Sequence, residues 1–403
     1  MRTPLRRISI LTVCLVFLPD LTRGAILNGI DILKRDRCSS LQGKRVGLIC
    51  NHTSVDLTGR HTADLIQGTS GVTLGALFSP EHGFSGHIEH GIKTADQIDP
   101  LRRIPIYSLY GNTRRPTADM LKDLDILIYD IQDVGVRFYT YITTLGYCME
   151  EAARHHLEFY VLDRPNPLSG TIIEGETLDE SFRDFTAYYP LPVRYGMTAG
   201  EIAVWYNKTR RLGLRLTVIR MEGWSRNNFW DETFPPFPAP SPNIPSPEAA
   251  LLYAGMGALE ATNISVGRGT SEPFQLIGAP WLNHLELAHR LKRLSLPGIQ
   301  VEPTVFTPQK DIYAGLPCAG IVLCVTDPQS ARPVDLFAHL FEIILQLHPH
   351  EFLPRWEEIP RVTGSRRFQE HIRSQTPIQR YLDSIHDEAL SFEREREPFL
   401  LYP

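Results

Sequence analysis

Short runs of apolar residues, each closed by polar or turn-forming residues, recur through the first half of the chain. Four such runs occupy residues 45–50, 74–78, 125–130 and 158–163. Their length and their β-branched and aromatic content suit buried parallel strands. Between the last two runs, apolar residues recur at intervals of three and four, which predicts a one-faced helix over 144–156. The order strand, helix, strand predicts an α/β fold with a doubly wound parallel sheet.

A proline-rich, aromatic segment separates this first region from the rest of the chain. Residues 234–247 read FPPFPAPSPNIPSP, and the prolines limit regular structure there. We interpret the segment as an ordered loop between two halves, with a flexible linker as the alternative. Beyond it, residues 319–325 predict a strand and residues 334–348 a long helix.

The first 24 residues have the pattern of a targeting segment. Three arginines in MRTPLRR precede the apolar run ISILTVCLVFL, and LTRGA follows. The basic-then-apolar order predicts a signal peptide over residues 1–24, and therefore a secreted or periplasmic protein. A buried first strand and an uncleaved anchor are the alternatives. We expect no membrane span beyond this possible leader, because no other segment is long and apolar enough.

The composition and net charge of the chain argue against one class of function, nucleic-acid binding. The chain has 403 residues, 42% of them hydrophobic and 22% charged, and a formal net charge of −5. This length allows two or three domains with cores of their own. A nucleic-acid-binding protein needs a basic face to neutralise phosphates, and the basic runs here are short. We therefore expect no nucleic-acid partner.

Polar residues follow directly on the predicted strands. Asn51, Glu81, Asp133 and Asn166 all lie in segments into which those strands run. Ligands of open parallel sheets bind outside the carboxyl ends of the strands. The sequence therefore predicts a polar crevice along this edge, with Glu81 in it.

The stretch SPEHGFSGHIEHG, residues 79–91, raises the alternative of a metal site. His82, His87 and His90 could supply ligands, but glycines and a serine separate them and no helix frames them as in HExxH. No glycine-rich nucleotide motif and no GxSxG nucleophile elbow occurs. We expect neither metal nor cofactor.

Two glutamates are candidates for acid–base chemistry. Glycoside hydrolysis needs a carboxylic acid on one side of the anomeric carbon, and a second carboxylate or a substrate group on the other. The acid must keep its proton near neutral pH, so we expect burial or a neighbouring charge to raise its pKa. Glu81 and Glu174 both lie among apolar neighbours. The residues alone support a polar crevice suited to a carbohydrate or another polar metabolite.

Several long motifs, in order, carry a family resemblance. They are GKRVGLICNHTSVD (43–56), LFSPEHGFSG (77–86), YDIQDVGVRFYTYITT (129–144), VLDRPNPLSG (161–170), PVRYGMTAGE (192–201), PSPNIPS (240–246) and NISVGRGTSEPFQLIGAPW (263–281). On these motifs the chain resembles the exo-β-N-acetylmuramidase family of glycoside hydrolases. The resemblance runs from about residue 28 onward, and its motifs end at Trp281.

The resemblance implies both an architecture and an activity. It implies a Rossmann-like catalytic half, here residues 25–240, a smaller α+β half over residues 241–403, and an active-site cleft between them. The implied activity releases terminal non-reducing N-acetylmuramic acid from peptidoglycan fragments. N-acetylmuramic acid carries a lactyl carboxylate, and a buried carboxylate favours a charged, bidentate partner. The arginines of the motifs would supply that partner.

The resemblance also implies roles for particular residues. Glu81 of SPEHG is implied as the leading catalytic residue and Glu174 as its partner. Motif residues expected to bind the substrate are Asn51, His82, Asp133, Arg137, Tyr139, Asn166, Arg194, Asn243 and Arg268.

The chain departs from the family pattern at a few positions. Tyr195 stands where the family usually has a histidine, and a tyrosine does not exchange a proton at neutral pH as imidazole does. His87 and His90 lie outside the usual motif. Tyr195 keeps open the alternative of a non-catalytic muropeptide- or sugar-binding protein, and a metal-dependent hydrolase is a third alternative.

Overall fold

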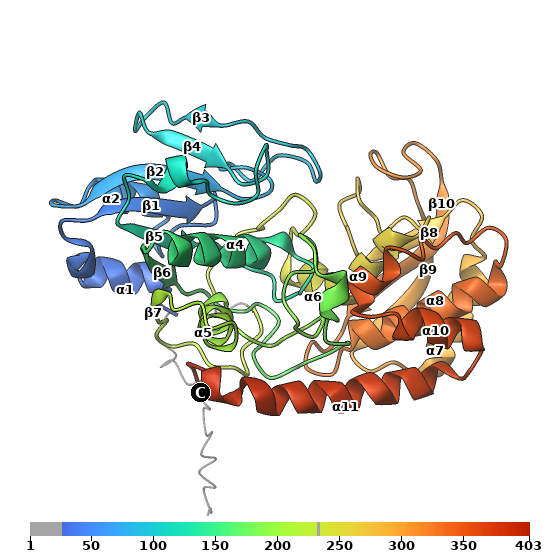
Figure 1. Cartoon of the computed structure of the whole chain (residues 1–403). Helices are drawn as coiled ribbons and strands as arrows, with labels where there is room; N and C mark the ends of the chain where they lie inside the picture. The colour runs from blue at the N-terminus through green and yellow to red at the C-terminus, as the bar shows by residue number, and fades with distance from the viewer. Residues whose placement is uncertain (1–25, 232–233) are drawn as a thin grey trace, which may run out of the picture.

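The computed structural model describes residues 26–231 and 234–403, and it places two α/β units side by side (Figure 1). The leader predicted over residues 1–24 lies outside the described residues. The first unit is built on a seven-stranded sheet of order β3-β4-β2-β1-β5-β6-β7. Its strands are β1 (Arg45–Cys50), β2 (Thr73–Ser79), β3 (Gln97–Ile98), β4 (Pro105–Ser108), β5 (Ile126–Asp130), β6 (Glu158–Leu162) and β7 (Arg215–Ile219).

All neighbouring strands of this sheet pair in parallel except β3 and β4, which are antiparallel. The four strands predicted from apolar runs are confirmed to within one residue at each end. They are short, and their sides are covered, which is why they lack the alternation of half-exposed strands. The predicted doubly wound α/β fold is therefore confirmed.

Helices cover both faces of the sheet because alternate strand residues point to opposite sides. Val46 and Leu48 of β1 pack with α1 (Gly29–Arg35) and α2 (Thr62–Gln67) in one apolar cluster. Ile49 packs in a second cluster with α4 (Thr140–Arg154) and α5 (Ala199–Thr209). The short α3 (Ala118–Leu121) completes this unit. Helix α4 begins four residues before its predicted start, and Thr198 and Glu201 form the capping box of α5.

The second unit holds a three-stranded antiparallel sheet of order β8-β10-β9. Its elements are α6 (Pro247–Met256), β8 (Leu276–Ala279), α7 (His284–Leu294), β9 (Ile299–Phe306), β10 (Cys318–Val325), α8 (Pro333–Leu347), α9 (Ile359–Thr363), α10 (Arg367–Ser374) and α11 (Ile378–Arg396). Helix α6 packs closely on α8: a Cβ on Gly255 would lie 1.8 Å from the Pro333 carbonyl oxygen. The α+β character implied for this half is confirmed.

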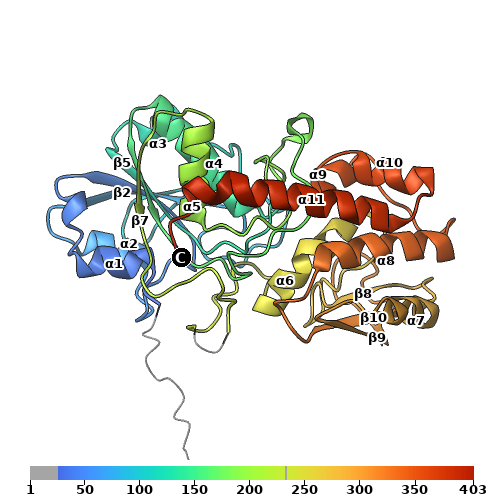
Figure 2. The same ribbon diagram turned by 90° about the horizontal axis from the view of Figure 1, so that it is seen from below.

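The last helix joins the two units. Helix α11 runs beneath both, and the chain end returns to the first sheet (Figure 2). There the Tyr402 hydroxyl donates to Asp163 at 2.6 Å, and the Leu401 amide donates to Glu201 at 2.7 Å. The predicted division at residue 240 stays a prediction, since the C-terminal segment packs on the other side of it.

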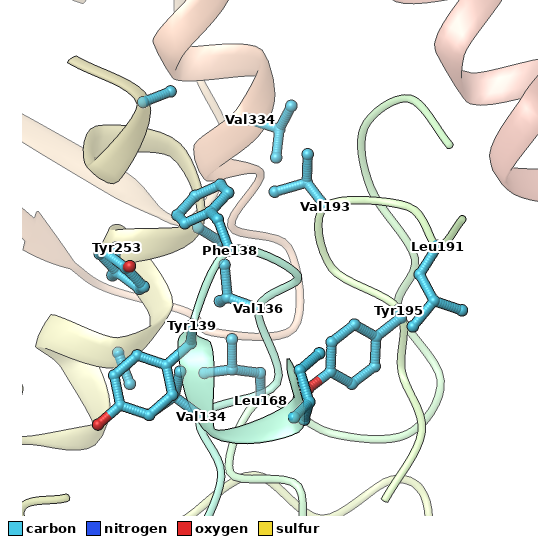
Figure 3. Close-up of a cluster of buried hydrophobic side chains, with 14 of the residues drawn as sticks. Val134, Val136, Phe138, Tyr139, Leu168, Leu191, Val193, Tyr195, Tyr253 and Val334 are labelled. Atoms are coloured by element: carbon cyan, nitrogen blue, oxygen red, sulfur yellow. The ribbon is translucent and has the colours of Figure 1, made fainter. Parts of the chain in front are cut away.

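Apolar side chains fill the interface between the units. Figure 3 shows Val334 of α8 facing Val193, and Phe138 beside Tyr253 of α6. The Phe138 and Tyr253 rings meet edge to face with centroids 5.0 Å apart. The proline-rich segment also packs here, since the Tyr141 hydroxyl donates to the Pro240 carbonyl at 2.7 Å. These contacts agree with an ordered loop. Among the described residues, no helix has the length and hydropathy to cross a membrane.

Candidate active site

A cavity of about 570 Å³ lies between the two units, and both supply its walls. Sites that bind small ligands and cofactors fall in this size range. The first unit contributes the segment after β2 and the segment before α4. The second contributes α6, the 3-10 turn 257–261 and the loops around residues 268 and 311. Five of the predicted site residues line it: Glu81, His82, Tyr139, Asn243 and Arg268.

A tight turn directs Glu81 into this cavity. The turn follows β2, with His82 at φ +69° and Gly83 at φ +72°. Glycine adopts this left-handed conformation without strain, whereas a histidine does so at a cost and is found there when its surroundings fix it. The His82 ring is held by the Ile88 carbonyl oxygen, 2.6 Å from Nδ1.

The Glu81 carboxylate is buried, with 3% of its side chain exposed, and both its oxygens are bonded. The Thr140 hydroxyl, at the start of α4, donates to Oε2 at 2.7 Å. His90 Nδ1 lies 2.9 Å from Oε1, and the Gly91 amide donates to the same oxygen at 3.4 Å. A carboxylate held by several donors at a cavity wall is suited to exchange protons with a bound ligand.

The pKa of Glu81 is lowered, whereas the sequence led us to expect that it is raised. Burial raises its pKa, but the hydrogen bond and charge of His90, with the Thr140 hydroxyl, outweigh burial and bring the pKa to about 2. The pKa of His90 is raised in turn, chiefly by its hydrogen bond to Glu81. The unliganded pair therefore carries its proton on the imidazole.

Arg268 is the predicted arginine that faces the cavity. Its Nε is bonded to Glu260, Asp311 lies 4.0 Å away, and its guanidinium carbon is 5.5 Å from the centre of the Phe274 ring. No hydrogen bond of its two terminal nitrogens to another described residue is found. The Tyr253 ring packs between Phe138, edge to face at a centroid distance of 5.0 Å, and Phe274, tilted at 4.7 Å, and forms an apolar wall beside Arg268.

Glu174 and Arg194 do not line the cavity, so the predicted pairing of Glu174 with Glu81 is not seen. The Glu174 Oε2 accepts from Arg194 Nη1 at 2.8 Å, and the side chains are 2% and 0% exposed. Arg194 also donates to the Leu168 carbonyl oxygen at 2.6 Å. Antiparallel backbone hydrogen bonds join the same two residues. Their motifs place them in the core, where each neutralises the other.

Four further predicted binding residues also lie outside the cavity wall. Arg137 is wholly buried and donates to the carbonyl oxygens of Leu191 and Val362, each at 2.8 Å. Asn166 bridges the Met197 carbonyl and the Leu168 amide, both at 2.9 Å. These contacts hold loops together and tie the first unit to α9.

Asn51 and Asp133 complete this set. Asn51 caps its own turn, accepting from the Thr53 amide at 2.9 Å. Asp133 accepts from the Gly135 amide at 2.8 Å and from the Tyr195 hydroxyl, and burial raises its pKa to about 6. Tyr195, the departure from the family pattern, is therefore a core partner of Asp133 and lies outside the cavity lining.

The three histidines of residues 79–91 face different partners. His82 meets the Ile88 carbonyl, His90 meets Glu81, and the His87 ring stacks on His52 with centroids 6.1 Å apart. Throughout the part of the chain that the structure describes, no group of three or more potential ligands is arranged to hold a metal ion.

Some residues that line the cavity were not predicted. They are Thr140, Tyr253, Glu260 and Asp311. Thr140 lies within a quoted motif, and its neighbour Tyr139 was singled out. Glu260 and Asp311 come from the second unit, outside the quoted motifs, and the sequence carries no local signal for them.

A buried carboxyl group at a strand end that faces a cavity lined by aromatic rings and an arginine fits one class of protein, the glycoside hydrolases. Comparison with known proteins gives the family. The N-terminal and C-terminal domains described as exo-β-N-acetylmuramidase NamZ match residues 46–248 and 251–402. The chain therefore belongs to the NamZ exo-β-N-acetylmuramidase family, and it is a glycoside hydrolase.

Similar proteins support the membership of this family over nearly the whole chain. Peptidoglycan β-N-acetylmuramidase NamZ of Bacillus subtilis (strain 168) is 39% identical over 378 residues, which cover 94% of this chain and 91% of that protein. Two crystal structures of DUF1343 family proteins from Bacteroides fragilis NCTC 9343 are also similar. One is 35% identical with a TM-score of 0.87, the other 28% identical with a TM-score of 0.76. Each comparison covers 94% of this chain and 99% of the other.

Proposed function

We propose that this protein removes terminal N-acetylmuramic acid from the non-reducing end of peptidoglycan fragments, with Glu81 as its reacting carboxyl group. The observation that carries the proposal is the position of Glu81, buried at the end of β2 and facing a cavity walled by both units. Membership of the NamZ family supports the substrate. So does the Bacillus subtilis relative, which is named for its action on peptidoglycan.

The proposed chemistry gives Glu81 the proton transfer to the leaving sugar oxygen. A second group must stabilise the positive charge that develops at the anomeric carbon. Glu174, predicted for this role, does not line the cavity and is bound to Arg194, so we propose that another group fills it. The N-acetyl oxygen of the substrate can stand in for a protein carboxylate, as in substrate-assisted glycosidases.

Arg268 is the proposed partner of the lactyl carboxylate. It is the only one of the predicted arginines that lines the cavity, and two of its nitrogens have no hydrogen-bond partner among the described residues. An arginine–carboxylate hydrogen bond in a desolvated cavity is stronger than one between neutral groups. The lactyl group distinguishes N-acetylmuramic acid from N-acetylglucosamine, so this contact would select the substrate.

We expect Arg268→Met to lower kcat/KM on a chromogenic N-acetylmuramide by roughly 10- to 100-fold, because a charge-assisted hydrogen bond contributes about 1.5–3 kcal/mol. Turnover of the matching N-acetylglucosaminide should change little. The control is Arg361→Met. Arg361 also lines the cavity, but its side chain is 50% exposed, whereas that of Arg268 is 12% exposed. An equal loss on both substrates in Arg268→Met would contradict the assignment.

A direct test of the function combines hydrolysis with calorimetry. The wild-type protein should release N-acetylmuramic acid from a muramide or a peptidoglycan fragment without added cofactor. Binding of N-acetylmuramic acid without any turnover would instead identify a non-catalytic sugar-binding protein.

We also propose that the protein acts outside the cytoplasmic membrane. The support is the order of basic and then apolar residues over positions 1–24, and the location of peptidoglycan. Fractionation of cells that produce the full chain, with N-terminal sequencing of the product, tests this. A cytoplasmic protein with an intact N-terminus would contradict it.

A further inference from the structure

The loop that follows Glu81 returns to it within ten residues. His90 Nδ1 lies 2.9 Å from Glu81 Oε1, and both residues line the cavity. The His90 side chain is 56% exposed, whereas that of Glu81 is 3% exposed. The imidazole therefore stands between a buried carboxylate and the solvent.

We propose that His90 is a positioning residue that stores the proton which Glu81 delivers to the leaving sugar oxygen. The two side chains then act as one unit that carries a single proton. This inference rests on the proposed function and adds to it a residue outside the motifs of the family resemblance.

The two carboxylate oxygens of Glu81 have different contacts and therefore different roles. Thr140 donates to Oε2 at 2.7 Å and keeps that oxygen occupied as an acceptor. Oε1 faces His90 and is the atom that can take the imidazole proton. Because the pKa of Glu81 is about 2 and that of His90 is raised, the resting proton is on Nδ1.

The enzyme neither gains nor loses a proton over one turnover. The proton moves from His90 Nδ1 to Glu81 Oε1 and then to the leaving oxygen, which also takes the electron pair of the broken C–O bond. Water adds to the anomeric carbon and releases one proton to the solvent. The neutral imidazole, which is open to that solvent, takes up one proton and returns to its starting state.

Other titratable groups lie around the Glu81–His90 pair, on the elements that pack against it. They are His82, Tyr110, Tyr141, Tyr253, Glu260 and Arg268. Burial lowers the pKa of His82, so it is neutral where His90 titrates. Arg268 lowers and Glu260 raises the pKa of His90, and these two form an ion pair with each other. Burial raises the pKa of the three tyrosines, which remain protonated.

The pH profile of kcat/KM on a chromogenic N-acetylmuramide tests the inference. In the wild-type enzyme, activity should fall on the alkaline side as His90 loses its proton, above the ordinary histidine pKa of 6.5. In His90→Gln, the pKa of the Glu81 carboxyl group alone determines the pH at which activity falls on the alkaline side. We expect this alkaline limb of the profile to move to lower pH by about one unit or more.

Two controls separate this role from a structural one. His87→Gln, which changes a histidine of the same loop stacked on His52, should keep the wild-type profile. A His90→Gln enzyme that is slower but has an unmoved alkaline limb would overturn the inference. The change at His90 should leave the fold intact because more than half of the side chain is exposed.

An NMR titration gives a readout that needs no substrate. The His90 ring should titrate above 6.5 in the wild-type protein and at lower pH in Glu81→Gln, where the negative partner is gone. An unchanged His90 titration would also overturn the inference. Wild-type turnover in Glu81→Gln, by contrast, would overturn the proposed role of Glu81, so the two failures are distinguishable.

Discussion

Replacing Glu81 with glutamine should lower kcat for release of N-acetylmuramic acid by about 10²- to 10⁴-fold. Glutamine has the size of glutamate, and its carbonyl oxygen can still accept the Thr140 hydrogen bond. Its amide cannot deliver a proton to the leaving oxygen. A chromogenic N-acetylmuramide and a circular dichroism spectrum together measure activity and fold.

The neighbouring residue Glu89 provides the matched control. It lies in the same loop, but its side chain is 51% exposed and forms an ion pair with Lys310. Glu89→Gln should keep turnover close to that of the wild type. Wild-type turnover in Glu81→Gln would remove Glu81 from the mechanism.

The second large effect concerns stability. Arg194→Met should lower the free energy of unfolding by about 3–5 kcal/mol, because it leaves the Glu174 carboxylate buried without its partner. The Leu168 carbonyl would also lose its donor. Urea denaturation of the variant and the wild type measures the difference.

The pH dependence of this loss follows from the protonation of Glu174. Burial raises the pKa of Glu174 even beside Arg194, and removing the arginine would raise it further. A carboxyl group with a raised folded-state pKa binds its proton more tightly in the folded than in the unfolded protein. The loss should therefore be smallest at acid pH, where Glu174 is protonated in both folded proteins, and should grow as pH rises past the folded-state pKa of the wild type towards the higher pKa of the variant.

A surface ion pair serves as the control for this prediction. Arg35 and Glu222 are joined at 2.7 Å, and their side chains are 51% and 54% exposed. Arg35→Met should change the free energy of unfolding far less than Arg194→Met does. An equal effect in the two variants would contradict the distinction between a buried and an exposed pair.

The Glu174→Gln variant tests whether this glutamate takes part in the reaction. It should retain turnover per folded molecule, since the side chain lies outside the cavity lining. A loss comparable to that of Glu81→Gln, in a folded variant, would return Glu174 to the mechanism.

Local pattern was enough to place the strands and the leading carboxylate. The strands at β1, β2, β5 and β6 were predicted because short apolar runs and their polar ends depend on neighbouring residues alone. Glu81 was predicted at the edge where the cavity lies because residues after a parallel strand lie at one known edge of the sheet. The family motifs then indicated the activity.

Motif membership did not separate residues of the cavity from residues that support it. Arg137 lies in the same motif as Tyr139 and Thr140 of the cavity wall but is buried in the core, and Arg194, which also lies in a quoted motif, is buried there with Glu174. Their partners are distant in sequence: Arg137 donates to the carbonyl oxygen of residue 362. A buried charge needs such a partner, and no local pattern shows whether one will be present.

The sequence by itself determined the order of the elements, the edge of the sheet where the chemistry lies, and the position of Glu81. Only the tertiary structure decided which charged residues face the cavity, that Glu260 and Asp311 of the second unit join Arg268 there, and that Glu81 rests as a carboxylate beside His90. The physical reason is that a pKa and a binding role depend on desolvation and on charges brought close by folding, whereas strands and turns leave a local pattern of apolar and polar residues in the sequence.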